Sequence, residues 1–239
     1  MKKLFLGCII VSMFFVVTNC GMADMTNPTA NEFDVVIVGD SIFDLDGFIH
    51  DNLKTLAGKS YKDYSRSGDS VAYITNQYNT AIAKRPTIKT IIMDAGGNDI
   101  LMDTYWSQAC QSSTMNISSS CKTYLNGVLD NVESLWEDMN ADGVDNIFHL
   151  GYYSLKAGTL TTLLYGKTRL NGAVQYADIQ LNSGCAVSPA ECWFIDPRAD
   201  FLGKEATYIK SDGIHPTNPG AKVIATKIWN KMVAVGAYK

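Results

Sequence analysis

The stretch that decides the fold reads Val35-Val36-Ile37-Val38-Gly39-Asp40-Ser41-Ile42. Its β-branched run ends abruptly at a glycine, which is typical of a short buried strand at the centre of a sheet. In open α/β sheets, ligands bind at the carboxyl ends of such strands. Ser41 therefore stands where chemistry is expected. A Gly-Asp-Ser turn is common by itself, so a base, an orienting acid and an oxyanion site must come from elsewhere in the chain.

The rest of the chain alternates between predicted strands and helices. Further strands are predicted at residues 61–65, 87–94, 144–150 and 193–196. Amphipathic helices are predicted at about residues 47–56, 70–84, 122–139, 160–179 and 218–235. This alternation indicates a parallel sheet covered by helices on both faces. The length of 239 residues and the hydrophobic share of 46% predict one compact domain.

The charge of the chain indicates which kinds of partner to expect. The formal net charge is −4, and no cluster of basic residues stands anywhere in the chain. A protein whose main partner is a polyanion carries basic side chains that neutralise its phosphates. We therefore expect no nucleic acid as a partner, while the charge by itself selects no substrate.

The N-terminus has the pattern of a bacterial secretion signal. Lys2 and Lys3 precede an apolar run that is too short to span a membrane. We expect residues 1–20 to be this signal, residues 21–33 to form a polar tether and residues 34–239 to form the folded domain. The mature protein is therefore expected to be exported.

Two processing routes are open at the end of this signal. The segment Val17-Thr18-Asn19-Cys20 resembles a lipoprotein processing site in which Cys20 carries the lipid, although Asn19 replaces the usual small residue. Ordinary cleavage after Gly21-Met22-Ala23 is the alternative. We favour the lipoprotein, because a cysteine directly after an apolar run is uncommon by chance. It would attach the protein to a membrane of the cell envelope, whereas ordinary cleavage would give a periplasmic or secreted protein.

Four cysteines remain for the folded domain, namely Cys110, Cys121, Cys185 and Cys192. An even number in an exported chain indicates disulfides, and four cysteines allow three pairings. Short loops close at the lowest entropic cost, which favours Cys110 with Cys121 and Cys185 with Cys192. A zinc site is disfavoured, because no CxxC spacing occurs and no histidine stands nearby. We therefore expect no metal.

Three polar blocks supply candidate partners for Ser41. Asp212 and His215 stand three residues apart around a glycine, so the carboxylate can accept the imidazole Nδ1–H and leave Nε2 free to take a proton. Asn98 follows two glycines after a predicted strand, which presents an amide at the carboxyl end of that strand. Gly68 precedes a predicted helix, and its backbone N–H would point into the same crevice. Each block alone also fits an ordinary turn.

Taken together and in order, four blocks carry a family resemblance. They are Gly39-Asp40-Ser41-Ile42, Gly68, Gly96-Gly97-Asn98-Asp99 and Asp212-Gly213-Ile214-His215. With them the chain resembles the SGNH or GDSL hydrolases, a family of secreted and cytosolic esterases, over essentially the whole mature sequence. Ile42 departs from the leucine that is usual in the family, and the second block is a single glycine chosen by its position.

The resemblance implies Ser41 as the nucleophile, His215 as the general acid and base, and Asp212 as its orienting partner. The backbone N–H groups of Ser41 and Gly68 and the side-chain amide of Asn98 would form the oxyanion hole. The implied reaction is hydrolysis of O-acyl esters through an acyl-enzyme, with no metal or organic cofactor, and the chemistry of acyl transfer needs these same groups. An α/β-hydrolase is disfavoured, because the serine lies outside a Gly-x-Ser-x-Gly turn.

The strands and the resemblance predict a single three-layer α/β/α domain with a mainly parallel, flavodoxin-like sheet of five strands. The alternative function is a non-catalytic envelope protein that binds a glycan or a protein partner with the same fold. The enzyme is favoured, because a binding protein has no reason to keep Ser41, Asn98, Asp212 and His215. The acyl and alcohol groups stay open, so small-molecule, lipid and glycan esters are all candidate substrates. We expect a monomer.

The remaining histidines and aromatic residues are assigned no chemistry. His50 falls within a predicted helix and is expected to be structural or solvent-facing, and His149 falls inside a strand and is expected to be a hydrogen-bonded interior or edge residue. Several aromatic residues near predicted loops would stack against a sugar or an aryl ring, and equally fit ordinary packing. They are Tyr105, Trp106, Tyr152, Tyr153 and Tyr165.

Overall fold

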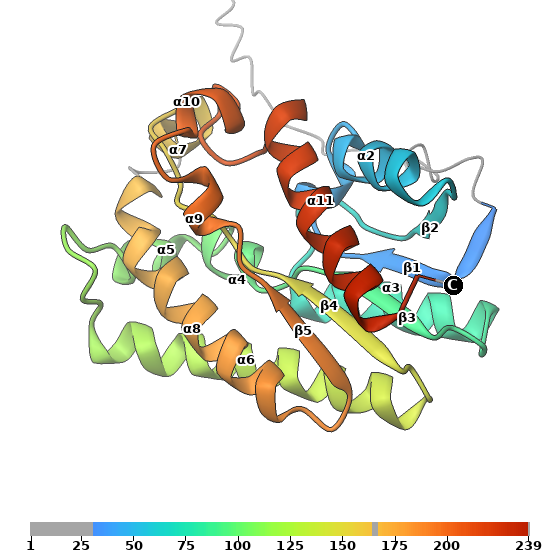
Figure 1. Ribbon diagram of the computed structural model, residues 1–239. Coiled ribbons are helices and arrows are strands. Elements are labelled where there is room, and N and C mark those ends of the chain that lie inside the picture. The colour runs from blue at the N-terminus through green and yellow to red at the C-terminus, as the bar shows by residue number, and fades with distance from the viewer. Residues whose placement is uncertain (1–30, 164–166, 239) are drawn as a thin grey trace, which may run out of the picture.

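The computed structural model describes residues 31–163 and 167–238, so the predicted secretion signal, Cys20 and Tyr165 lie outside the described residues. Its centre is a five-stranded sheet in the order β2-β1-β3-β4-β5, in which all neighbouring strands are parallel (Figure 1). The strands are β1 (Glu32–Val38), β2 (Tyr61–Asp63), β3 (Thr90–Met93), β4 (Asn146–Leu150) and β5 (Glu191–Ile195). This is the strand order of flavodoxin-like sheets, and it confirms the predicted fold class.

Helices connect the strands and cover both faces of the sheet. The described helices are α1 (Ser41–Asp44), α2 (Phe48–Ala57), α3 (Val71–Lys84), α4 (Gly97–Leu101), α5 (Thr104–Ala109), α6 (Ser119–Ala141), α7 (Thr159–Leu163), η1 (Lys167–Leu170), α8 (Asn171–Val187), α9 (Arg198–Phe201), α10 (Glu205–Tyr208) and α11 (Asn218–Val235). Among the described residues, none of these helices is both long and apolar enough to cross a membrane.

Strand β1 divides its side chains between two hydrophobic layers. Val35 and Ile37 belong to one buried cluster, and Val36 and Val38 belong to the other. This division follows from the geometry of a strand, in which successive side chains point to opposite faces. Because all four side chains are buried, β1 lies in the middle of the molecule, as its unbroken apolar run predicted.

Helices α2 and α11 belong to one layer and helix α3 to the other (Figure 1), while α6 and α8 contribute side chains to both. The layer of Ile37 contains Ile49 from α2 and Ile228 from α11, which pack together across one face of the sheet. The layer of Val36 contains Tyr78 from α3 and Trp136 from α6, on the opposite face. Helix α8 packs beside α6 and against β5.

The helix before β5 differs from its prediction. A helix over about residues 160–179 was predicted, and Asn182, Ser183 and Gly184, which follow it, have weak helix propensity. The structure instead continues α8 to Val187, so Cys185 lies within the helix. A side chain at Gly184 would collide with the Glu133 carboxylate of α6. The close approach of α8 to α6 therefore outweighs the weak helix propensity of this segment.

Both predicted disulfides are present. Cys110 pairs with Cys121 and ties the end of α5 to the start of α6, and Cys185 pairs with Cys192 and ties α8 to β5. The segment before the first disulfide contains the short helix α5 (Thr104–Ala109). Each disulfide closes a short segment, which limits the conformations of the unfolded chain.

Candidate active site

Ser41 and His215 meet at the carboxyl edge of the sheet, although 174 positions separate them in the chain. Ser41 is the first residue of α1 and follows the turn that ends β1. His215 lies in the loop before α11, and its Nε2 is 2.9 Å from Ser41 Oγ. At this distance the ring nitrogen can accept the hydroxyl proton. The structure therefore brings together the serine and the histidine that the sequence paired.

Asp212 holds the other side of the imidazole ring. Its Oδ2 is 2.9 Å from His215 Nδ1, and its Oδ1 accepts the backbone N–H groups of Ile214 at 2.8 Å and of His215 at 2.9 Å. Partial burial opposes the ionisation of Asp212, but these hydrogen bonds and the His215 ring hold the pKa of Asp212 below its ordinary value. An ionised Asp212 keeps a proton on Nδ1 and leaves Nε2 as an acceptor.

The loop that carries His215 is fixed by contacts on both sides. Gly213 has a φ of +91°, and a side chain there would collide with the Lys156 carbonyl oxygen, so this position requires glycine. The Tyr153 hydroxyl donates a hydrogen bond of 2.6 Å to the Ile214 carbonyl oxygen. These contacts hold the imidazole ring at its distance from the serine.

The turn before Ser41 is clamped by buried polar side chains. The Asp40 carboxylate caps α1 by accepting the Ile42 N–H at 2.9 Å. Gln77 of α3 accepts the Gly39 N–H at 2.8 Å and donates to the Gly39 carbonyl oxygen at 2.9 Å. Sequence reasoning missed Gln77. Its signal was a polar residue on the buried stripe of an amphipathic helix.

Asp94 lies directly behind this turn, at the end of β3. Its Oδ1 accepts the Asp40 N–H at 2.8 Å, and a side chain at Gly39 would collide with the same oxygen. Burial and the negative charge of Asp40 raise the pKa of Asp94 well above its ordinary value. A neutral Asp94 avoids a second buried charge beside Asp40.

No group of three or more His, Cys, Asp or Glu residues in the described ranges is placed to hold a metal ion.

Tyr152 supports the same turn from the loop after β4. Its hydroxyl donates to Asp40 Oδ2 at 2.9 Å and accepts the Gly97 N–H at 3.2 Å. Burial and the charge of Asp40 raise the pKa of Tyr152 well above its ordinary value, so the hydroxyl keeps its proton. The sequence singled out Tyr152 only as an aromatic ring, and its polar role was missed.

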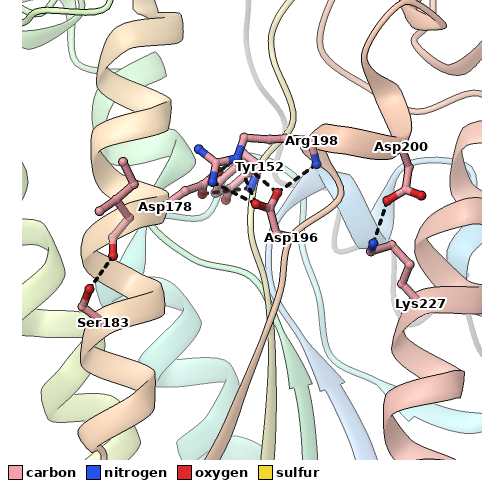
Figure 2. A network of polar contacts seen from close by, with 8 residues as sticks. Tyr152, Asp178, Ser183, Asp196, Arg198, Asp200 and Lys227 are labelled. Atoms are coloured by element: carbon pink, nitrogen blue, oxygen red, sulfur yellow. Dashed lines mark hydrogen bonds and ion pairs between the residues drawn. The ribbon is translucent and has the colours of Figure 1, made fainter.

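Figure 2 shows a second polar network, which holds the backbone of Tyr152. Arg198 Nη2 is 2.9 Å from Asp196 Oδ2, and Arg198 Nε is 3.4 Å from Asp178 Oδ2. Asp178 of α8 is buried and accepts the Tyr152 N–H at 3.1 Å. Burial raises the pKa of Asp178 to about 7, although the Tyr152 N–H and Arg198 favour its charged form. The network fixes the point from which Tyr152 reaches Asp40.

Asn98 lies in the first turn of α4 and is buried. Its Nδ2 donates to the Asp69 carbonyl oxygen at 3.1 Å and to Asp40 Oδ2 at 3.3 Å. Both N–H groups of this amide are therefore shared with protein acceptors, and the bond to Asp40 is the longer and weaker one. The structure brings Asn98 to the turn that carries Ser41, as expected from the glycines before it.

Gly68 lies in the loop between β2 and α3. It has a φ of +86°, which favours glycine. Its neighbour Ser67 donates its N–H at 2.8 Å and its hydroxyl at 2.5 Å to Asp44 Oδ2, which fastens the loop to α1. The next residue, Asp69, receives the Asn98 amide. Among the hydrogen bonds of the described residues, the Gly68 N–H has no protein partner.

The other two histidines belong to the interior. His50 is buried on α2, with its Nε2 3.3 Å from Ser60 Oγ. His149 is fully buried in β4 against Trp136 and Phe194, but neither ring nitrogen has a hydrogen-bond partner among the described residues. Burial lowers the pKa of His149 to about 3. His149 is therefore a neutral core residue, and the prediction that it is hydrogen-bonded is wrong.

The other predicted aromatic residues divide between packing and exposure. Tyr153 stacks on Phe201 and Trp106 stacks on Tyr124, each pair with ring centroids 4.2 Å apart. Tyr105 is 70% exposed. Ordinary packing therefore accounts for Tyr153 and Trp106, and Tyr105 is available at the surface.

Comparisons with known proteins agree on the fold. No protein-family model matches the chain, and no curated protein matches it in sequence. Solved structures do match. A protein from Slackia heliotrinireducens that is provisionally assigned as an SGNH hydrolase is 19% identical, with a TM-score of 0.60 over 84% of this chain and 100% of its own.

Two further structures carry the names of lipolytic proteins. A GDSL-like lipase from Bacteroides thetaiotaomicron is 15% identical, with a TM-score of 0.59 over 85% of this chain and 88% of its own. A member of the lipolytic G-D-S-L family from Veillonella parvula is 16% identical, with a TM-score of 0.59 over 83% of this chain and 97% of its own. The chain therefore has the fold of the SGNH/GDSL hydrolases, which confirms the predicted resemblance at the level of the fold.

Proposed function

We propose that this protein is a serine esterase of the SGNH/GDSL type that hydrolyses O-acyl esters through an acyl-enzyme. The observation that carries the proposal is the unbroken hydrogen-bonded chain from Asp212 through His215 to Ser41, in which both links are 2.9 Å long. The shared fold with proteins named GDSL-like lipase and lipolytic protein supports the reaction class. One chain supplies all three residues, so we propose that the monomer is active.

The first half of the reaction acylates Ser41. His215 Nε2 takes the hydroxyl proton as Ser41 Oγ attacks the carbonyl carbon of the ester, and the carbonyl oxygen becomes negative in the tetrahedral intermediate. His215 then gives this proton to the alcohol oxygen, and the bond between that oxygen and the carbonyl carbon breaks. The alcohol leaves, and the acyl group stays on Ser41.

The second half frees the enzyme by the same route. His215 takes a proton from water as the water oxygen attacks the acyl carbon, and it returns the proton to Ser41 Oγ when the acyl–serine bond breaks. Asp212 stabilises the imidazolium in both halves and is not itself protonated. The products are a carboxylic acid and the original serine.

The negative oxygen of each intermediate needs hydrogen-bond donors. We propose the backbone N–H groups of Ser41 and Gly68 and the side-chain amide of Asn98 for this role. The unused Gly68 N–H supports it. Because both N–H groups of Asn98 are occupied, the long bond to Asp40 of 3.3 Å is the one that we expect to be exchanged for the oxyanion.

Hydrolysis of p-nitrophenyl esters tests this proposal. We expect the purified protein to release p-nitrophenol from these esters, and Ser41→Ala to abolish the release while Ser183→Ala, at an exposed position of α8, keeps most of it. Binding of a glycan or a protein without hydrolysis of any ester would favour the non-catalytic alternative instead.

We also propose that the protein acts outside the cytoplasm, with Cys20 as its lipid anchor. The two disulfides support an oxidising compartment. Metabolic labelling with an alkyne fatty acid tests the anchor. Label that is present in the native chain and lost in Cys20→Ala supports it, and a secreted chain without label would favour ordinary cleavage after Ala23.

A further inference from the structure

A narrow apolar cavity opens beside Ser41 and leads away from it between α6 and α8. About 60 Å³ of the cavity is open to the centre of a sphere the size of a water molecule, several times the minimum that one water molecule needs. Ser41, Ile42 and Asn98 are among the residues that line it. Whatever fills the cavity therefore lies directly beside the proposed nucleophile.

The cavity runs lengthwise along both helices. Its lining from α6 includes Leu125 and Leu129, four residues apart, and its lining from α8 includes Ala173, Ala177 and Leu181, again at intervals of four. Residues at this spacing lie one above the other on a helix. The α8 lining therefore extends over about 12 Å at 1.5 Å per residue. The alanines leave open a space that larger side chains would fill.

The far end and the outer side of the cavity are covered. Leu181 is 2% exposed and packs in the same buried cluster as Trp136 and Cys185. On the outer side, the Tyr176 hydroxyl of α8 donates a hydrogen bond of 2.8 Å to Asn126 Oδ1 of α6. We call this cavity the slot: it is closed at that end and on that side, and Ser41 is among the residues that line it.

The polar side chains that line the slot are those of Asp40, Ser41, Asn98, Tyr152 and Tyr153, and none of them comes from α6 or α8. Asp40 lines it, but its Oδ2 already accepts hydrogen bonds from Tyr152 and from the Asn98 amide. The deeper lining from α6 and α8 consists of Leu, Val and Ala side chains, which offer a ligand no hydrogen bond. A sugar would lose its bonds to water there, whereas a hydrocarbon chain would gain by leaving water.

The position of the base indicates which half of an ester enters the slot. The leaving oxygen must receive its proton from His215 Nε2, and His215 is not among the residues that line the slot. Asn98, the proposed donor to the carbonyl oxygen, does line it. The alcohol also has to leave while the acyl group is still bound to Ser41, which a slot that is closed at its far end would hinder. The slot therefore suits the acyl half.

We propose that this slot holds the acyl chain, and that the substrates are esters of unbranched aliphatic acids of medium length in preference to acetyl esters. This inference rests on the proposed esterase function and adds the substrate class to it. Each methylene that enters the slot is removed from water, and straight chains fit a slot between two parallel rows of apolar side chains.

The chain-length profile of the native protein is the first test. With p-nitrophenyl acetate, butyrate, octanoate and palmitate, we expect kcat/KM to rise from acetate to octanoate by up to about fourfold for each added methylene. It should fall at palmitate, whose chain is longer than the slot. A profile that is highest at acetate would overturn the acyl slot and leave the esterase proposal standing. No hydrolysis of any ester would overturn both.

A matched pair of variants on α8 tests whether the acyl chain lies in the slot. Ala177→Phe fills the middle of the slot and should lower kcat/KM for octanoate relative to acetate by at least about tenfold. Ala186→Phe makes the same change at an exposed residue that does not line the slot, and its profile should stay native. Equal losses on acetate and octanoate in Ala177→Phe would contradict the proposal.

A measurement on the native chain keeps the test decisive if Ala177→Phe does not fold. Alkyl p-nitrophenyl phosphonates react with a catalytic serine and place the alkyl group where an acyl chain would lie. We expect their inactivation rate to rise from methyl to octyl phosphonate. A rate that is independent of the alkyl chain, with Ser41 modified in each case, would overturn the slot and support the esterase.

Discussion

The Tyr152 hydroxyl donates a hydrogen bond of 2.9 Å to the Asp40 carboxylate, across 112 positions of the chain. Asp40 immediately precedes Ser41 and caps the helix that Ser41 begins. Through this one bond, the loop after β4 helps to set the orientation of the turn after β1. The proposed nucleophile is thus positioned by residues that take no part in its chemistry.

The first prediction concerns this bond. Tyr152→Phe keeps the ring and removes the hydroxyl, so Asp40 loses a donor and the Gly97 N–H loses an acceptor. Unmade buried hydrogen bonds of this kind cost about 1–3 kcal/mol, and we expect a loss of that size in the free energy of unfolding, with a lower kcat for p-nitrophenyl esters. Tyr105→Phe, at an exposed ring, should leave both unchanged. Native stability in Tyr152→Phe would contradict the role.

The second prediction tests the orientation of His215. In Asp212→Asn, the amide oxygen can still accept the backbone N–H groups of Ile214 and His215, and the amide N–H then faces Nδ1. The ring would have to carry its proton on Nε2 and could not accept one from Ser41. We expect kcat to fall by about 10⁴-fold with little change in stability. Turnover within about tenfold of the native rate would remove Asp212 from the mechanism.

The third prediction separates Asn98 as an oxyanion donor from Asn98 as a loop residue. A donor that acts mainly on the negative intermediate contributes to kcat and little to KM. We expect Asn98→Ala to lower kcat by about 10²- to 10³-fold with KM nearly unchanged. Because the amide also bonds to Asp69, stability is measured alongside by urea unfolding. A folded variant with near-native kcat would exclude Asn98 from the oxyanion hole.

The fourth prediction uses the buried His149. In the unfolded chain a histidine takes up a proton below about pH 6.5, whereas burial keeps His149 neutral in the folded protein down to about pH 3. The unfolded state therefore binds more protons between these values, and stability falls with falling pH by about 1.4 kcal/mol per unit from this residue. His149→Leu should remove this slope.

Urea unfolding of the native chain and of His149→Leu, at about pH 7 and about pH 5, measures how much free energy of unfolding each protein loses over this range. The variant should also be the more stable at neutral pH, because it no longer buries two unpaired ring nitrogens. Parallel losses of stability in both proteins would mean that another group is responsible.

The sequence predicts those parts of the site that are local in the chain. The strand before Ser41 is a single apolar run, and the spacing of Asp212 and His215 around a glycine already allows their hydrogen bond. Since parallel strands and their loops meet at one edge of the sheet, these segments could be placed together without coordinates.

The supporting residues could not be predicted in the same way. Whether Tyr152, Gln77 and Asp94 contact the turn around Ser41 depends on the register and packing of four separate elements. The one local signal, a polar residue on the buried stripe of α3, does not say what Gln77 contacts. The acyl slot is hidden for a similar reason, because Ala173 and Ala177 look like ordinary positions on a buried helix face. The length of α8 was missed because its packing against α6 outweighs local propensity.

Covalent labelling of Ser41 tests the central claim most directly. The native protein is incubated with a fluorophosphonate and then analysed by intact mass and peptide mapping, beside His215→Ala as the matched control. The account predicts one adduct per chain, on Ser41, formed rapidly in the native protein and lost or greatly slowed in His215→Ala. No adduct on the folded native chain, or an adduct on another residue, would contradict it.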